Sequence, residues 1–196
     1  MLKKIILLLF ISSLSFVKAQ DNMQDLLSIP NPIEYDGTEY FISWSKPMSK
    51  TLYRQQYLPS DERTEDFTQL LDFSYFTKEI EMESAVRQKT EAIQNRAKTD
   101  KFAKVNVIEN PDGTEYIVDY FISESPEKGD SYIEYNVYRF KSYNNGSEKS
   151  FLILSQAKRM YGDLKSASKS LARQRDHLIT TMIEFKIPEI KVVAKN

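Results

Sequence analysis

The feature that most constrains this fold is a series of strand-like segments separated by short turns between residues 102 and 158. The intervening sequences are rich in residues that accept turn geometry, as in Asn110-Pro111-Asp112-Gly113. Turns this short join neighbouring antiparallel strands. The pattern therefore predicts a four-stranded antiparallel meander, with strands at 102–109, 115–124, 132–143 and 151–158.

The second strand of this meander is apolar on both faces. Val118 and Tyr120 lie on one face, and Ile117 and Phe121 lie on the other. A strand with this pattern is covered on both faces. Two amphipathic helices are available to cover it, so we expect one helix on each side of the sheet, in a three-layer sandwich.

Both helices are predicted from apolar residues at helical spacing. The segment 79–98 carries a narrow stripe, and the segment 163–185 carries a leucine or phenylalanine every seven residues. Pro188 ends the second helix. The members of the two stripes are Met82, Val86, Ile93 and Ala97, and then Leu164, Leu171, Leu178 and Phe185.

The remaining segments predict a hairpin and irregular ends. Residues 39–46 and 51–58 form a strand pair. Residues 71–76 fit either a strand or a helix, residues 20–37 are expected to be an extended arm, and 188–196 a loose tail. The whole predicts an α+β chain with a mainly antiparallel sheet and a single domain at 38–187.

The first 19 residues have the plan of a secretory signal peptide. Lys3 and Lys4 precede an apolar stretch of about 13 residues, and Val17-Lys18-Ala19 provides a cleavage site. A membrane-spanning helix needs about 20 apolar residues. We therefore expect cleavage after Ala19, export to the periplasm or the extracellular space, and no integral membrane segment in the mature chain.

Composition excludes several classes of function. Cleavage would remove three of the 27 basic residues and none of the 28 acidic ones, which leaves a net charge of −4. Neither a basic excess nor a basic face is evident, so no nucleic-acid partner is expected. The absence of cysteine excludes thiol nucleophiles and thiolate metal sites.

No catalytic motif stands out in the sequence. His177 is the only histidine and is expected at the surface, and no metal site, cofactor or catalytic residue is predicted. Paired carboxylates could serve a hydrolase of the cell envelope, which is the alternative function. The pairs considered are Asp119 with Glu134, on neighbouring strands, and Glu81 with Glu83, on the first helix.

Aromatic residues are the one feature above background, with 12 tyrosines, 11 phenylalanines and one tryptophan. Tyrosine and tryptophan combine a large apolar body with a polar tip, which suits binding surfaces. The high aromatic content is also explained if these residues fill the core of a sheet-rich protein. The candidate binding residues are Trp44 and Tyr40, expected on one face of the hairpin, and Tyr132 and Tyr138, expected on one face of the meander.

The order of elements, together with Tyr57-Leu58-Pro59-Ser60-Asp61-Glu62 before Phe67, resembles the Mog1/PsbP-like group of α/β/α sandwiches over residues 38–186. The resemblance implies a binding or assembly factor rather than an enzyme, and it transfers no functional residue. The sequence thus predicts an exported, non-catalytic binding module for a protein partner or a small ligand.

Overall fold

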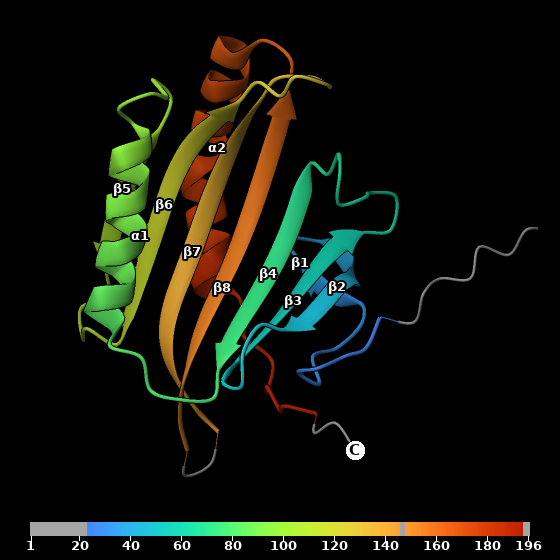
Figure 1. Ribbon diagram of the computed structural model, residues 1–196, viewed down its shortest axis with the longest axis vertical. Helices are drawn as coiled ribbons and strands as arrows, with labels where there is room; N and C mark the ends of the chain where they lie inside the picture. Colours follow the sequence, from blue (N-terminus) through green and yellow to red (C-terminus); the bar gives the residue numbers. More distant parts are fainter. Residues whose placement is uncertain (1–22, 146–147, 194–196) are drawn as a thin grey trace, which may run out of the picture.

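The computed structural model describes residues 23–145 and 148–193, so the predicted signal peptide lies outside the described residues. Eight strands form one antiparallel sheet in the order β1-β2-β3-β4-β8-β7-β6-β5. The sheet dominates the architecture and, with two helices, confirms the α+β class (Figure 1). The elements are β1 (Ile33–Tyr35), β2 (Thr38–Pro47), β3 (Leu52–Pro59), β4 (Gln69–Phe76), α1 (Met82–Arg96), β5 (Lys104–Glu109), β6 (Glu115–Glu124), β7 (Tyr132–Asn145), β8 (Glu148–Tyr161) and α2 (Leu164–Glu184).

Strand β4 joins the hairpin and the meander into one continuous sheet. The sequence pattern left residues 71–76 open between strand and helix, and the structure places them in a central strand. On one side β4 pairs with β3, and on the other it pairs with β8, where Phe73 lies opposite Leu154. The predicted meander is present as β5 to β8, but it is only half of the sheet.

The two helices pack against opposite sides of strand β6. Val86 and Ile93 of α1 belong to one apolar cluster with Val118 and Tyr120. Helix α2 contributes to a larger cluster that contains Ile117 of the same strand. Figure 1 shows α1 in front of β5 and β6 and α2 behind the sheet. Helix α1 contacts β5, β6 and β7, and α2 contacts β6, β7 and β8, so the contacts with the helices lie in one half of the sheet.

The ends of α1 are tied to their surroundings. Glu81 caps the N-terminus by accepting a hydrogen bond from the amide of Ser84 at 2.8 Å. Beyond the C-terminus, the buried carboxylate of Asp100 accepts hydrogen bonds from Ser123 of β6 and from Arg96 of α1. Burial alone would raise the pKa of Asp100, but these hydrogen bonds outweigh it and lower the pKa. Helix α1 is therefore a fixed wall beside the sheet.

The expectation of a loose C-terminal tail is wrong for residues 188–193. Ile190 is fully buried, and the amides of Lys191 and Val193 donate to the carbonyls of Leu27 and Leu26. The segment expected to be an extended arm also enters the core, because Leu26 and Leu27 are buried there and 33–35 form β1. Short apolar runs without a period gave no signal of this mutual packing.

Candidate functional site

Three of the four candidate binding residues lie on the face of the sheet on which α1 lies. We call it the α1-side face. In Figure 1 α1 lies over the β5–β6 edge of the sheet, and no helix lies in front of β8 and β4. Residues paired across β4 and β8 point to this face together. They are Phe76 with Phe151, Ser74 with Ile153, Asp72 with Ser155, and Leu70 with Ala157.

One of the four candidate binding residues is not on this face. Tyr40 is fully buried in the core on the α2 side of the sheet, where its hydroxyl donates to Gln69 at 3.3 Å. Burial raises the pKa of Tyr40 above its usual range, so the phenol stays neutral. The expectation of Tyr40 as a surface binding residue is wrong, since its aromatic ring serves core packing.

Trp44 and Tyr40 were expected on the same face of β2, and a bulge separates them. Ile42 pairs with Tyr57, but Trp44 pairs with Gln56, so one residue is inserted between them. A bulge of this kind turns the following side chains to the opposite face. Trp44 is therefore half-buried on the α1-side face, where the guanidinium of Arg54 lies 5.9 Å from its ring.

Tyr132 and Tyr138 share the α1-side face, as the alternation of β7 predicted. The guanidinium of Arg159 lies 4.4 Å from the ring of Tyr132 and 3.7 Å from that of Phe67. The ammonium of Lys89, from α1, lies 4.1 Å from the ring of Tyr138. Six residues of strand separate the two tyrosines by about 20 Å. The candidates thus share a face but not a single cluster.

Two ionic networks occupy the middle of the face, and the sequence reasoning missed both. Asp72 is buried and accepts hydrogen bonds from Arg54 at 2.6 Å and from Gln56 at 2.8 Å. Glu134 is paired with Arg159 at 2.6 Å. The available signal was the polar alternation of Arg54 and Gln56 in β3, which only indicated a wet face. These networks give the middle of the face fixed polar groups.

An apolar groove lies at one end of the face, between α1 and the strands. It has a volume of about 480 Å³, within the range of about 300–1,000 Å³ that is usual for ligand pockets. We call it the α1 groove. Its polar lining residues are Glu81, Ser84, Gln88 and Lys89, and its apolar ones are Phe76, Ile80, Ala85, Ala92, Phe140, Phe151 and Ile153.

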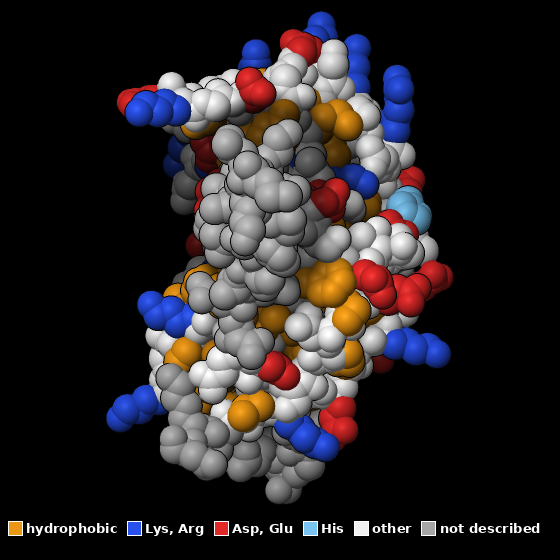
Figure 2. All heavy atoms as spheres, turned by 90° about the vertical axis from the view of Figure 1, so that its right-hand side faces the viewer, with side chains coloured by type: hydrophobic (Ala, Val, Ile, Leu, Met, Phe, Trp, Pro, Cys, Tyr) orange, Lys and Arg blue, Asp and Glu red, His pale blue; other side chains and the backbone are white. Residues whose placement is uncertain are grey.

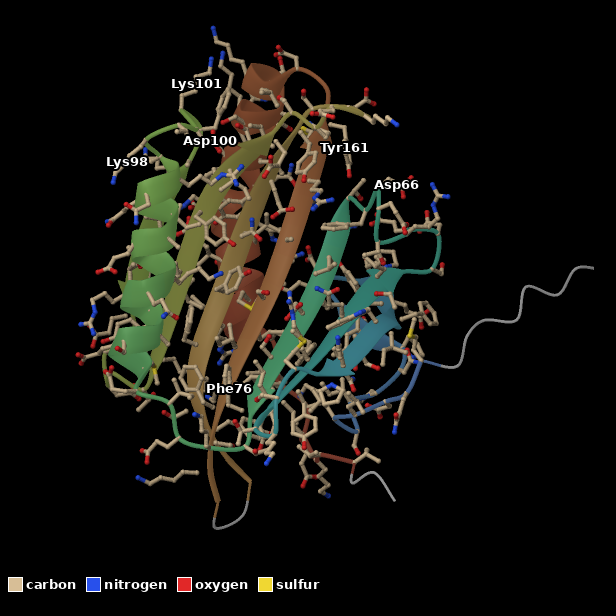
Figure 3. All side chains as sticks on the ribbon, viewed as in Figure 1. Asp66, Phe76, Lys98, Asp100, Lys101 and Tyr161 are labelled. Atoms are coloured by element: carbon tan, nitrogen blue, oxygen red, sulfur yellow. The ribbon has the colours of Figure 1, made fainter. Side chains whose placement is uncertain are left out.

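A second recess lies at the opposite end of the face. It has a volume of about 470 Å³, and its lining includes Tyr132, Tyr161 and the carboxylates of Asp66 and Asp130. Figure 3 labels Phe76 at the lower end of the face and Tyr161 and Asp66 at the upper end. The face therefore runs from an apolar groove, through ionic networks, to a recess with acidic and aromatic residues.

Of the carboxylate pairs considered for hydrolysis, Asp119 and Glu134 are separated by the sheet, whereas Glu81 and Glu83 line one recess near the start of α1. Asp119 lies on the α2 side, where Arg175 binds both its oxygens at 2.8 Å, whereas Glu134 lies on the opposite face. Glu81 is engaged as the N-cap of α1. A retaining or inverting glycoside hydrolase needs its two carboxylates on either side of the bond that is cleaved. The sheet prevents this arrangement for Asp119 and Glu134, because they lie on opposite faces.

His177 lies at the surface, as expected, and its ring nitrogen is 3.0 Å from Asp36. Within residues 23–145 and 148–193, no three His, Cys, Asp or Glu side chains are grouped to hold a metal ion. Neither described helix is long and apolar enough to cross a membrane. Figure 2, which faces the β1–β2 edge, shows hydrophobic side chains in small areas among polar and charged ones.

Comparison with known proteins places the chain in a family without adding a relative of known activity. No curated protein matches the chain, and no solved structure does. A protein-family model does match, and it covers residues 27–187. This range begins at the buried Leu27 and includes every strand and both helices, and the chain therefore belongs to that family.

Proposed function

We propose that this protein is an exported, non-catalytic binding module that holds a ligand on its α1-side face. The observation that carries the proposal is the α1 groove, an apolar hollow at one end of the α1-side face, with the fixed polar groups of Asp72 and Glu134 farther along the face. A mostly apolar groove with a few placed polar groups is the usual form of a ligand site. The resemblance to the Mog1/PsbP-like group implies the same class of function.

The scaffold suits such a role because the opposite side of the sheet is filled. We infer that β5 to β8, between α1 and α2, act as a three-layer sandwich, which makes the floor of the groove rigid. Phe140 and Phe151, in that floor, are buried with ring centroids 6.4 Å apart. A preformed site loses little freedom when a ligand binds, which favours affinity.

The proposal has two claims, export through a cleaved signal and binding of a ligand. Native mass spectrometry of the protein recovered outside the cytosol tests both claims. We expect a chain that starts at Gln20 and carries an additional ligand mass. Replacing Ala92, an exposed residue of the groove wall, by tryptophan is expected to fill the groove and remove that mass. Gln94→Trp, on the same helix but outside the groove lining, is the matched control.

Two results would contradict the proposal. Retention of residues 1–19 would contradict export through a cleaved signal. The absence of any bound mass, or an equal bound mass in the wild type and in Ala92→Trp, would show that the groove does not hold the ligand.

A further inference from the structure

Lys89 lines the α1 groove, where its ammonium lies against aromatic rings. The ammonium of Lys89 lies 4.1 Å from the ring of Tyr138 and 5.7 Å from that of Tyr120. Among residues 23–145 and 148–193, Arg54 and Arg159 of the same face have carboxylate partners, and Lys89 has no ion pair. Lys89 is thus free to pair with a group brought by a ligand.

The aromatic rings beside Lys89 supply no compensating negative charge. Burial raises the pKa of Tyr120 far above its usual range, and the neighbouring Tyr138 raises it further, so Tyr120 stays a neutral phenol. The rings hold the ammonium through cation–π attraction. An ammonium positioned this way, half-buried and unpaired with a carboxylate, is complementary to an anionic group.

Away from Lys89, the groove is suited to an apolar chain. Phe140 and Phe151 form its buried floor, and the partly exposed Phe76, Ile80 and Ile153 present apolar surface to a ligand. The small side chains of Ala85 and Ala92 leave room along the helix. The lining residues of α1 extend from its N-cap to position 92, about 16 Å along the helix axis. This shape accepts an elongated apolar body rather than a compact polar one.

Polarity along the groove orients such a ligand. Glu81 lies at the other end of the helix wall, about 12 Å from Lys89 along the axis, and its carboxylate is held by the amide of Ser84. An anionic group would be repelled at the Glu81 end and attracted at the Lys89 end. A cationic group would be attracted at the Glu81 end and repelled at the Lys89 end.

We propose that the α1 groove binds an amphipathic carboxylic acid, with its apolar chain against Phe76, Ile80 and Ile153 and its carboxylate beside Lys89. This inference rests on the proposed function and names the ligand class for the same site. It assigns Lys89 as the residue that selects an acid over a neutral or cationic molecule with the same chain.

Calorimetric titration of the mature chain, freed of bound ligand by refolding, tests the inference with three probes that share a twelve-carbon chain. They are laurate, dodecanol and dodecyltrimethylammonium, each below its micelle concentration. We expect laurate to bind most tightly and Lys89→Gln to weaken it by about tenfold, which corresponds to about 1.4 kcal/mol. Dodecanol binding should stay unchanged in that variant. Lys89→Arg should retain laurate binding, because it keeps the charge.

The matched control is Lys98→Gln, which removes the same charge beyond the end of α1, at the upper left of Figure 3 and away from Phe76. It should leave laurate binding unchanged. Failure of laurate to bind, equal binding by wild type and Lys89→Gln, or equally tight binding of the cationic probe would overturn the inference. If laurate fails while native mass spectrometry shows a ligand that Ala92→Trp removes, the binding function stands and only the carboxylic acid is wrong.

Discussion

A Leu171→Asp variant is expected to lose about 2–5 kcal/mol of unfolding free energy, because it places a charge in the apolar core. Leu171 is fully buried in α2 and packs in the larger apolar cluster with Leu178 and Met182. Since the unfolding free energy of a domain is about 5–15 kcal/mol in total, this loss is a large fraction of its stability.

Urea or thermal unfolding followed by circular dichroism measures this effect. Ala172→Asp introduces the same residue at the next, exposed position of α2 and should change stability by no more than about 0.5 kcal/mol. If Leu171→Asp and Ala172→Asp unfold at the same midpoint, α2 does not pack on the sheet as the structure describes.

An Arg139→Gln variant is expected to lose about 3–5 kcal/mol of unfolding free energy, since it breaks a buried ion pair and leaves backbone carbonyls of α2 without a donor, although Lys141 still pairs with Glu115. Arg139 is buried, and it donates to Glu115 at 2.6 Å and to the backbone carbonyls of Met182, Ile183 and Phe185 at 3.0–3.1 Å. The last carbonyls of a helix have no partner within it. Arg139 therefore ties the C-terminus of α2 to β7, and glutamine is too short to reach the same acceptors.

The pH dependence of stability gives this prediction an independent readout. Burial alone would raise the pKa of Glu115, but hydrogen bonds from Arg139 and Lys141 outweigh it and lower the pKa in the folded state. The ordinary carboxyl pKa, about 4.3, applies when unfolded. The stabilisation is therefore complete above that pH and is lost as the pH falls through the lowered, folded value.

Arg139→Gln should accordingly be less stable at neutral pH and should lose less stability on acidification than the wild type. Arg87→Gln, at an exposed position of α1, should behave as the wild type does. An Arg139→Gln protein with unchanged stability and an unchanged acid profile would show that this arginine does not hold α2.

Local periodicity predicted the elements well where each carries its own signal. The helices expected at 79–98 and 163–185 are found at Met82–Arg96 and Leu164–Glu184. The meander is found because its turns are short and its strands long. Both kinds of pattern depend on residues close in sequence, so one chain is enough to read them.

Pairings between distant segments could not be predicted in this way. Strand β4 is central because it pairs with β8, more than 70 residues later, and no local pattern encodes that partner. The bulge before Trp44 reversed its expected face, since one inserted residue moves every later side chain. The α1 groove likewise depends on side chains of α1, β4, β7 and β8 coming together, so Lys89 and Ile153 gave no signal as members of one site.

The claim that the α1-side face is occupied in the exported environment is tested most directly by thiol labelling. The chain has no cysteine, so Gln88→Cys places a unique thiol in the groove lining, and Gln94→Cys places one on the same helix outside it. Both positions are exposed in the protein alone. Labelling rates are compared between the unfractionated exported material and the purified, ligand-free protein.

The thiol at position 88 is expected to react about tenfold more slowly in the exported material, which is the slowing expected when the concentration of free ligand is about ten times its Kd. The thiol at position 94 should react at the same rate in both. Equal rates at position 88 in the two preparations would contradict the proposal that this face binds a ligand.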